Sequence, residues 1–183
     1  MAAARADCSV TVIEGCGIRL RRAGAADADF LVELVNDEDV KPFLAAVRPA
    51  DRESILAEIE RSQREPDAYG VFVIEVDGER VGTVDFERAN QRSRIARVGG
   101  LAVHPAFRGR RVGDEAARLL QRHLVFDLGY HRLELEIYGF NERAMAHAER
   151  SGFVREGVKR KAYWRDGGWV DGVCYGLVRE DLE

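Results

Sequence analysis

The chain has 183 residues, of which 46% are hydrophobic and 33% are charged, and its formal net charge is −4. This length and composition predict one globular domain that buries its core without disulfides or metal ions. The slightly acidic balance argues against nucleic-acid binding, which relies on an excess of Lys and Arg. No apolar run approaches the ~20 residues that cross a bilayer, and the N-terminus has no secretory core, so a cytoplasmic protein without a membrane partner is expected.

The cysteines and histidines give no sign of a metal or redox site. Cys8, Cys16 and Cys174 form no Cys-x-x-Cys pair, and the four histidines have no ligand spacing with them. We therefore expect incidental thiols and no bound metal.

The first quarter of the chain predicts a short strand followed by two helices. Residues 1–16 are Ala-rich and weakly patterned, which is typical of a lead-in that precedes a folded domain at 17–183. Residues 18–21 alternate polar and apolar side chains, as a strand does. Asp27 is a candidate N-cap for the first helix, and Asp51 opens the second.

The middle of the chain predicts an antiparallel meander of three strands. Residues 69–76 are apolar on both faces, as in a central strand, and the Asp-Gly pair at 77–78 is a hairpin signal into 80–86. Residues 94–103 form the third strand. The Gly pair at 99–100 within it predicts a bulge or a close backbone approach.

The loop after this strand has the composition of an anion site. An apolar run ends at Val103, and glycines and arginines follow before an amphipathic helix that a glycine ends at 129. Backbone N–H groups at a helix start have no intrahelical partner, and the helix dipole adds positive charge there. Arg108, Arg110 and Arg111 add three charges, so this loop is predicted to bind phosphate.

The remaining elements complete the predicted fold. Residues 133–137 alternate with period two, and the strand, helix and strand from 94 to 137 form a right-handed crossover with parallel strands. Two strands at 153–164 and 169–178 close the chain as a hairpin. We predict a single α+β domain with about four helices and a mixed, mostly antiparallel, seven-stranded sheet.

Two motifs resemble the acetyl-CoA site of the GNAT superfamily of N-acetyltransferases. The family signature is Arg or Gln, two residues, Gly, one residue, then Gly or Ala; here it stands as Arg-Gly-Arg-Arg-Val-Gly at 108–113, with Arg111 in place of the central glycine. The second motif is Asn141, two residues, Ala144, and then Glu-Arg-Ser-Gly-Phe at 149–153.

The resemblance covers roughly residues 17–179, and the closing segment at 163–167 is similar to the ribosomal-protein alanine acetyltransferase branch. It implies that the central parallel strands are splayed and that the pantetheine arm of acetyl-CoA lies in the gap. It also implies a set of cofactor-binding residues: Leu101, Val103, Arg108, Gly109, Arg110, Arg111, Val112, Gly113 and Asn141.

Acetyl transfer by direct attack in a ternary complex needs a neutral amine, a proton acceptor and donors to the oxyanion. In many relatives a tyrosine protonates the departing thiolate, but that position is Ala148 here. The acidic base that relatives carry on the strand predicted at 94–103 is replaced by Arg97. Glu136 and Tyr138 share one strand face and are our catalytic candidates, with a solvated strand edge as the alternative. We expect His147 to be exposed.

The acceptor is predicted to be a primary amine. Four acidic residues around the first helix have two explanations, a solvated helix face or a patch that attracts a cationic amine or basic peptide: Glu33, Asp37, Glu38 and Asp39. A protein or peptide N-terminal amine is the leading acceptor. The alternatives are a polyamine, amino acid or antibiotic amine, or a non-catalytic acyl-CoA-binding module, and the protein could be a monomer or a homodimer.

Overall fold

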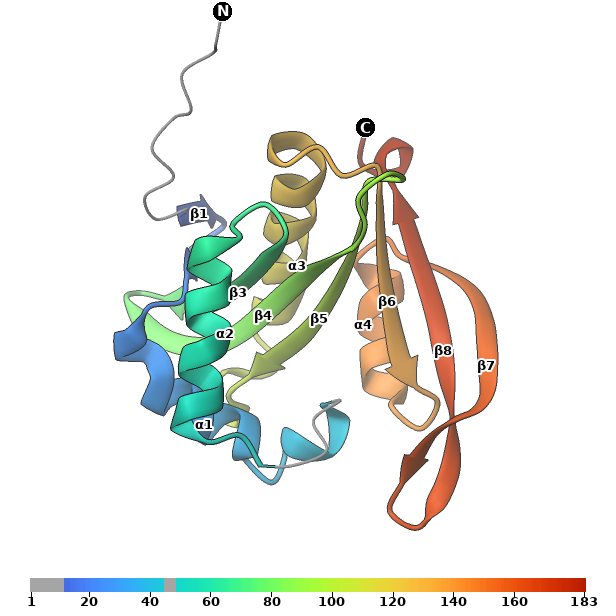
Figure 1. Cartoon of the computed structure of the whole chain (residues 1–183), viewed down its shortest axis with the longest axis horizontal. Coiled ribbons are helices and arrows are strands. Elements are labelled where there is room, and N and C mark those ends of the chain that lie inside the picture. The colour runs from blue at the N-terminus through green and yellow to red at the C-terminus, as the bar shows by residue number, and fades with distance from the viewer. Residues whose placement is uncertain (1–11, 45–48) are drawn as a thin grey trace, which may run out of the picture.

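The computed structural model describes residues 12–44 and 49–183, which form one open sheet flanked by helices (Figure 1). The strands are β1 Val12–Gly15, β2 Ile18–Arg22, β3 Tyr69–Val76, β4 Glu79–Asn90, β5 Ile95–Val103, β6 Arg132–Tyr138, β7 Val154–Arg165 and β8 Gly168–Val178. Their order in the sheet is β1-β2-β3-β4-β5-β6-β8-β7. The α-helices are α1 Ala28–Asn36, α2 Arg52–Arg64, α3 Val112–Arg122 and α4 Glu142–Arg150.

The prediction of seven strands was short by one. β1 pairs antiparallel with β2 through the two-residue turn Cys16-Gly17, where both residues have positive φ, 52° and 76°. Two such residues are what a type I′ hairpin needs. The chain is therefore regular from Val12, inside the expected lead-in; residues 1–11 lie outside the described part. The mixed sheet with one parallel pair is otherwise as predicted.

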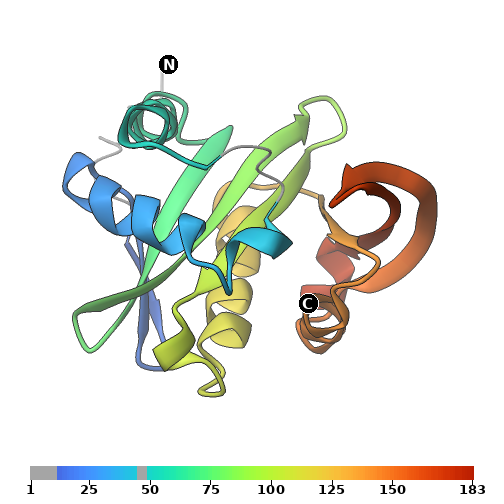
Figure 2. The ribbon, with the colours of Figure 1, turned by 90° about the horizontal axis from the view of Figure 1, so that it is seen from below.

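Helices cover both faces of the first half of the sheet (Figure 2). Phe72 on β3 and Phe86 on β4 are fully buried in the core on the α3 face, with Leu120 of that helix. Val73, the next residue on β3, packs on the other face with Leu31 of α1 and Ile59 of α2. β3 is apolar on both faces because it is covered on both faces.

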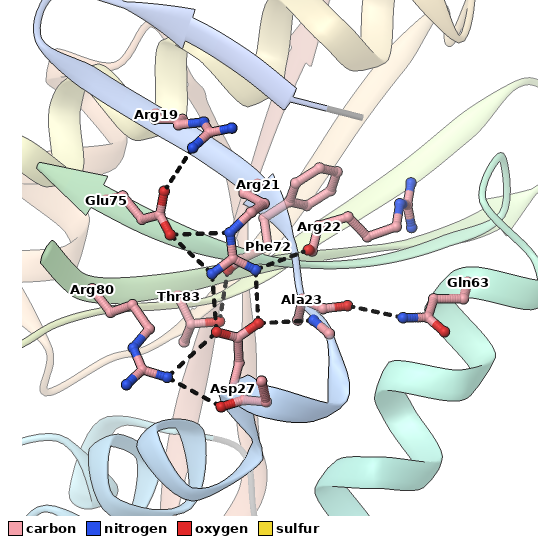
Figure 3. A network of polar contacts seen from close by, with 12 residues as sticks. Arg19, Arg21, Arg22, Ala23, Asp27, Gln63, Phe72, Glu75, Arg80 and Thr83 are labelled. Atoms are coloured by element: carbon pink, nitrogen blue, oxygen red, sulfur yellow. Dashed lines mark hydrogen bonds and ion pairs between the residues drawn. The ribbon is translucent and has the colours of Figure 1, made fainter. Parts of the chain in front are cut away.

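A buried ion-pair network fixes the start of α1 (Figure 3). The Arg21 guanidinium lies 2.7 Å from Asp27 and 2.9 Å from Glu75 on β3. Burial acts to raise the pKa of Asp27, but hydrogen bonds from Arg21 and the Gly24 N–H outweigh it and the pKa is lowered. Asp27 occupies the N-cap position of α1, as expected, but its side chain makes no capping bond there.

The two parallel strands separate soon after they meet, and Figures 1 and 2 show β6, β7, β8 and α4 standing apart from the first half of the sheet. β5 and β6 pair only from Ile95↔Arg132 to Arg97↔Glu134. On its other side β5 carries the expected bulge: the β4–β5 register shifts between residues 83 and 85, opposite Gly100, whose φ is 58°. The edge of β5 that faces β6 is consequently unpaired over residues 98–103.

Candidate active site

A cleft of about 700 Å³ opens where β5 and β6 diverge. Its walls are β5, the loop that follows, and the facing parts of α3, β6 and α4. Nine of the eleven residues predicted for the site line it: Leu101, Val103, Arg108, Gly109, Arg111, Val112, Gly113, Glu136 and Asn141. Arg110 and Tyr138 do not line it.

The loop at 109–113 presents backbone donors to this cleft. The first N–H groups of α3 have no intrahelical acceptor, and no turn or loop carbonyl in the described part of the chain accepts from residues 109–113. Gly109 and Arg111 both have positive φ, 78° and 59°, which turns successive N–H groups toward one side. Such a nest at a helix N-terminus binds anionic oxygens. The residue that replaces the signature glycine thus adopts the left-handed conformation that glycine prefers.

The three arginines of the loop have different surroundings. Arg108 donates from Nε to the Val103 carbonyl at 3.2 Å and from Nη2 to the Asp39 carbonyl at 3.2 Å, so it ties the loop to β5 and to the segment after α1. Arg110 lies over the Phe107 ring, 5.3 Å from its centroid. Arg111 is exposed.

α4 contributes a helix cap and a histidine to the cleft. Asn141 is buried, and its Oδ1 accepts from the Ala144 N–H at 3.1 Å, as its expected capping role requires. The expectation that His147 is exposed was wrong: its side chain is 19% exposed, and its Nδ1 lies 2.7 Å from Asp114 on α3. Asp114 reaches across from α3 and also meets Arg150, so sequence periodicity on α4 alone could not reveal the contact.

Glu136 lines the cleft from β6 and is held from β7. Its Oε2 lies 2.6 Å from Lys159 Nζ, and its Oε1 accepts from the Tyr163 hydroxyl at 2.7 Å. Burial acts to raise the pKa of Glu136, but these two hydrogen bonds outweigh it and lower the pKa. The carboxylate is therefore ionised at neutral pH and is a weak base.

Tyr138 belongs to an aromatic group beside the cleft. Its ring stacks on Phe140 at 5.5 Å and meets Tyr163 edge-on at 5.2 Å. Arg165 covers the ring at 4.9 Å and donates to the Pro42 carbonyl at 2.8 Å. The β7–β8 hairpin is thereby joined to the segment between α1 and α2, across the open end of the cleft.

Sequence reasoning did not single out Asp85 on β4. It pairs in register with Gly99, and burial, together with the negative charges of Glu58 and Glu87, raises its pKa to about 7. Period-two alternation in β4 places Asp85 on the helix α2 face, but only the packing of α2 creates that environment.

The acidic cluster around α1 is partly neutralised. Asp39 forms an ion pair with Arg108 at 3.8 Å, and the carboxylate of Asp37 accepts from the Asp39 N–H at 2.8 Å. Glu33 and Glu38 are exposed. Both readings of the cluster, an acceptor-attracting patch and a solvated face, are compatible with this arrangement.

Two kinds of feature are absent from residues 12–44 and 49–183. No three side chains of His, Cys, Asp or Glu lie together as a metal site would require. No helix there combines the length and apolarity needed to cross a bilayer.

Comparison with known families decides the class of this site. Residues 18–154 match the family model described as an acetyltransferase (GNAT) domain. The chain belongs to the GNAT family. The N-acetyltransferase YokL, an uncharacterized protein of a Bacillus subtilis prophage, is 31% identical over 124 residues, which are 66% of this chain and 68% of YokL. The protein is thus a GNAT enzyme of the N-acetyltransferase class.

Solved GNAT structures share the fold at lower identity. RimL, a ribosomal L7/L12 alpha-N-protein acetyltransferase in complex with coenzyme A, superposes with a TM-score of 0.82 at 19% identity, over 92% of this chain and 98% of RimL. A chimera of spermidine N-acetyltransferase SpeG from Vibrio cholerae and hSSAT gives 0.80 at 19% identity, over 92% and 99%. RimL is named for a protein acceptor and SpeG for a polyamine acceptor. The GNAT fold by itself therefore does not identify the acceptor.

Proposed function

We propose that this protein transfers an acetyl group from acetyl-CoA to a primary amine by direct attack in a ternary complex, within one domain that extends the predicted 17–183 to include β1. The observation that carries the proposal is the meeting, in one cleft, of the unpaired β5 edge at 98–103 and the N–H nest at 109–113. The edge suits the amide groups of pantetheine, and the nest suits the pyrophosphate. Both are backbone features, so they tolerate the substitution at Arg111.

The cofactor contacts that we propose are those named by the motifs. Leu101 and Val103 lie on the open edge of β5, and their side chains come within 3.8 and 3.9 Å of where a Cβ on Gly113 would be. The strand end and the helix start therefore close on each other at the phosphate position. Asn141 adds its buried amide from the start of α4.

The chemistry requires an oriented amine and a stabilised oxyanion. N–H groups on the open edge of β5 supply oxyanion donors in a partly enclosed cleft, where such donors act strongly. Glu136, ionised and fixed by two hydrogen bonds, is proposed to orient the amine rather than to take its proton. Tyr138 is proposed to shape the acceptor side through its aromatic neighbours.

A protein or peptide N-terminal amine is the acceptor we favour. Glu33, Asp37 and Glu38 lie around the end of α1, and negative charge there steers cationic acceptors through a field that salt screens over ~8 Å. Replacing Asp37 and Glu38 by Asn and Gln should raise KM for a cationic peptide and leave acetyl-CoA affinity unchanged. If added salt slows the acetylation of neutral and cationic acceptors equally, the acidic cluster is only a solvated helix face.

The test of the function is thiol release from acetyl-CoA in the presence of an amine panel: short peptides with free or blocked N-termini, spermidine and amino acids. Release with free but not blocked peptides supports the favoured acceptor, and release with spermidine alone supports the polyamine alternative. Because Ala148 and Arg97 replace the usual proton-handling residues, calorimetry should accompany the panel: CoA binding without thiol release from any amine would refute the proposed acetyl transfer.

A further inference from the structure

Asp85 lies directly over the β5 bulge. A Cβ on Gly100 would overlap the Asp85 carboxylate, and a Cβ on Gly99 would come within 3.1 Å of its Oδ1. Both glycines line the cleft. The bulge therefore does two things at once: it separates β5 from β6, and it leaves room for a carboxylate against the backbone beside the proposed thioester position.

This carboxylate has no partner that would hold it ionised. Within the described part of the chain it accepts no hydrogen bond and forms no ion pair. Protein atoms surround it closely, yet the residue keeps some accessible surface, as a group in a narrow recess does. Asp85 is not among the residues that line the cleft, whereas Gly99 and Gly100 are, so a water molecule is needed to carry a proton from the cleft to it.

The charges around Asp85 come from three strands and a helix. α2 presents Glu58 and Arg61, and Arg61 is engaged by Glu87 on β4 at 2.8 Å. β3 presents Tyr69, whose ring lies under Arg61 at 4.2 Å. From β5, Arg97 is opposite Glu87 in the register. α1 presents apolar residues, Phe30 and Leu34, to β5.

The protonation of Asp85 is set by this environment. Burial and then the repulsion of Glu58 and Glu87 raise its pKa to about 7. A general base is most effective when its pKa lies near the working pH, because enough of it is ionised and it still binds a proton well. Glu136 lacks this property, since its pKa is lowered.

We propose that Asp85 is the general base that takes a proton, through one water molecule, from the acceptor ammonium group in the cleft. This inference rests on the acetyl transfer proposed above. Relatives carry an acidic proton acceptor at the position of Arg97 on β5. In this protein the proton acceptor is assigned to the neighbouring strand β4.

The ammonium group gives one proton to the bridging water while that water gives one to Asp85, which later releases it to solvent. The neutral amine nitrogen then forms a bond to the thioester carbon. The tetrahedral intermediate collapses, the carbon–sulfur bond breaks, and the electron pair leaves on the sulfur. The second proton, lost from the same nitrogen, goes to the thiolate, so the products are the amide, CoA thiol and one released proton.

The test is the pH dependence of kcat/KM for Asp85→Asn, which keeps the shape of the side chain. Wild type should lose activity as pH falls through about 7, because protonated Asp85 cannot act as base. The variant should lose about 10²-fold or more in kcat and show no such acid limb, with CoA affinity by calorimetry unchanged. Asp85→Glu should recover part of the rate.

A second variant tests the assignment while Asp85 stays in place. Glu58→Gln removes a repelling charge, so the acid limb should move to lower pH, while CoA affinity stays the same. If the acid limb of Glu58→Gln does not move and Asp85→Asn keeps a near-normal rate, the assignment of Asp85 as the base is overturned. The proposed acetyl transfer would still stand. Wild type that releases no thiol with any amine would overturn the proposed function, and Asp85 as its base with it.

Discussion

The left-handed conformation of Arg111 makes the departure from the GNAT signature testable. A non-glycine residue in that region costs roughly 1–2 kcal/mol, and Arg111 has φ 59° and ψ 15°. Glycine loses more backbone freedom on folding, which offsets about 0.5–1 kcal/mol of the gain. Arg111→Gly should therefore stabilise the protein by about 0.5–1 kcal/mol, which is roughly 1–4 °C in Tm for a chain of this size.

Two matched variants separate strain from charge. Arg110→Gly, one residue earlier and without positive φ, should lower Tm, because it carries the entropic cost of glycine with no strain to relieve. Arg111→Ala removes the charge but keeps a Cβ at positive φ, so it should gain nothing in a thermal melt. Equal Tm values for Arg111→Gly and Arg111→Ala would refute the strain argument.

The same variants test which groups hold the phosphates. If the N–H nest dominates, loss of one exposed arginine should weaken CoA binding by less than tenfold, or about 1.4 kcal/mol, in calorimetry. A hundredfold loss in both Arg111 variants would show that the side chain, and not the backbone, provides the site.

Further predictions concern the cofactor, the catalytic candidates and acid stability. Gly113→Val should fold but bind CoA at least tenfold more weakly in calorimetry, since a Cβ there meets only ordinary contacts while a branched side chain enters the phosphate site. Glu136→Gln should lower kcat without changing CoA affinity, and unaltered turnover would remove Glu136 from the mechanism. Tyr138→Phe keeps the ring and its aromatic contacts, so it should leave kcat and CoA affinity unchanged; a fall in kcat would show that the hydroxyl takes part. The depressed pKa of Asp27 contributes stability that is complete above its ordinary value of 3.8 and is lost as pH falls through the lower folded-state pKa. Asp27→Asn should therefore be less stable at pH 7 and lose less stability on acidification, as followed by circular dichroism.

The fold was largely predictable because its signals are local. Alternation marks the strands at 18–21 and 133–137, and an apolar run marks the strand at 69–76. The Asp-Gly pair at 77–78 marks a hairpin, and both of its residues have positive φ. β1 was missed because four residues carry little periodicity, although the Cys16-Gly17 turn was a usable sign. The helix expected to end at Gly129 has its α-helical part only to Arg122, and a π-helical turn, His123–Asp127, follows.

The site was predictable where it is made of backbone and less so where it depends on contacts between elements. The loop at 108–113 carries its function in glycines and a helix start, which the sequence displays. The environment of Asp85 depends on Glu58 from a helix 27 residues earlier, and the position of His147 depends on Asp114, 33 residues before it. Such pairings arise only when the chain folds.

The unpaired edge of β5 has a consequence for solubility. Exposed N–H and C=O groups on an outer strand recruit strands of other chains and promote aggregation. Here the open edge lies inside the sheet, between β5 and β6, and α4 stands beside it. Another polypeptide chain cannot easily pair along residues 98–103, whereas a thin, flexible ligand can. Because the sheet is split in its middle, this protein has a strand edge that can hydrogen-bond a ligand but is shielded from the strands of other chains.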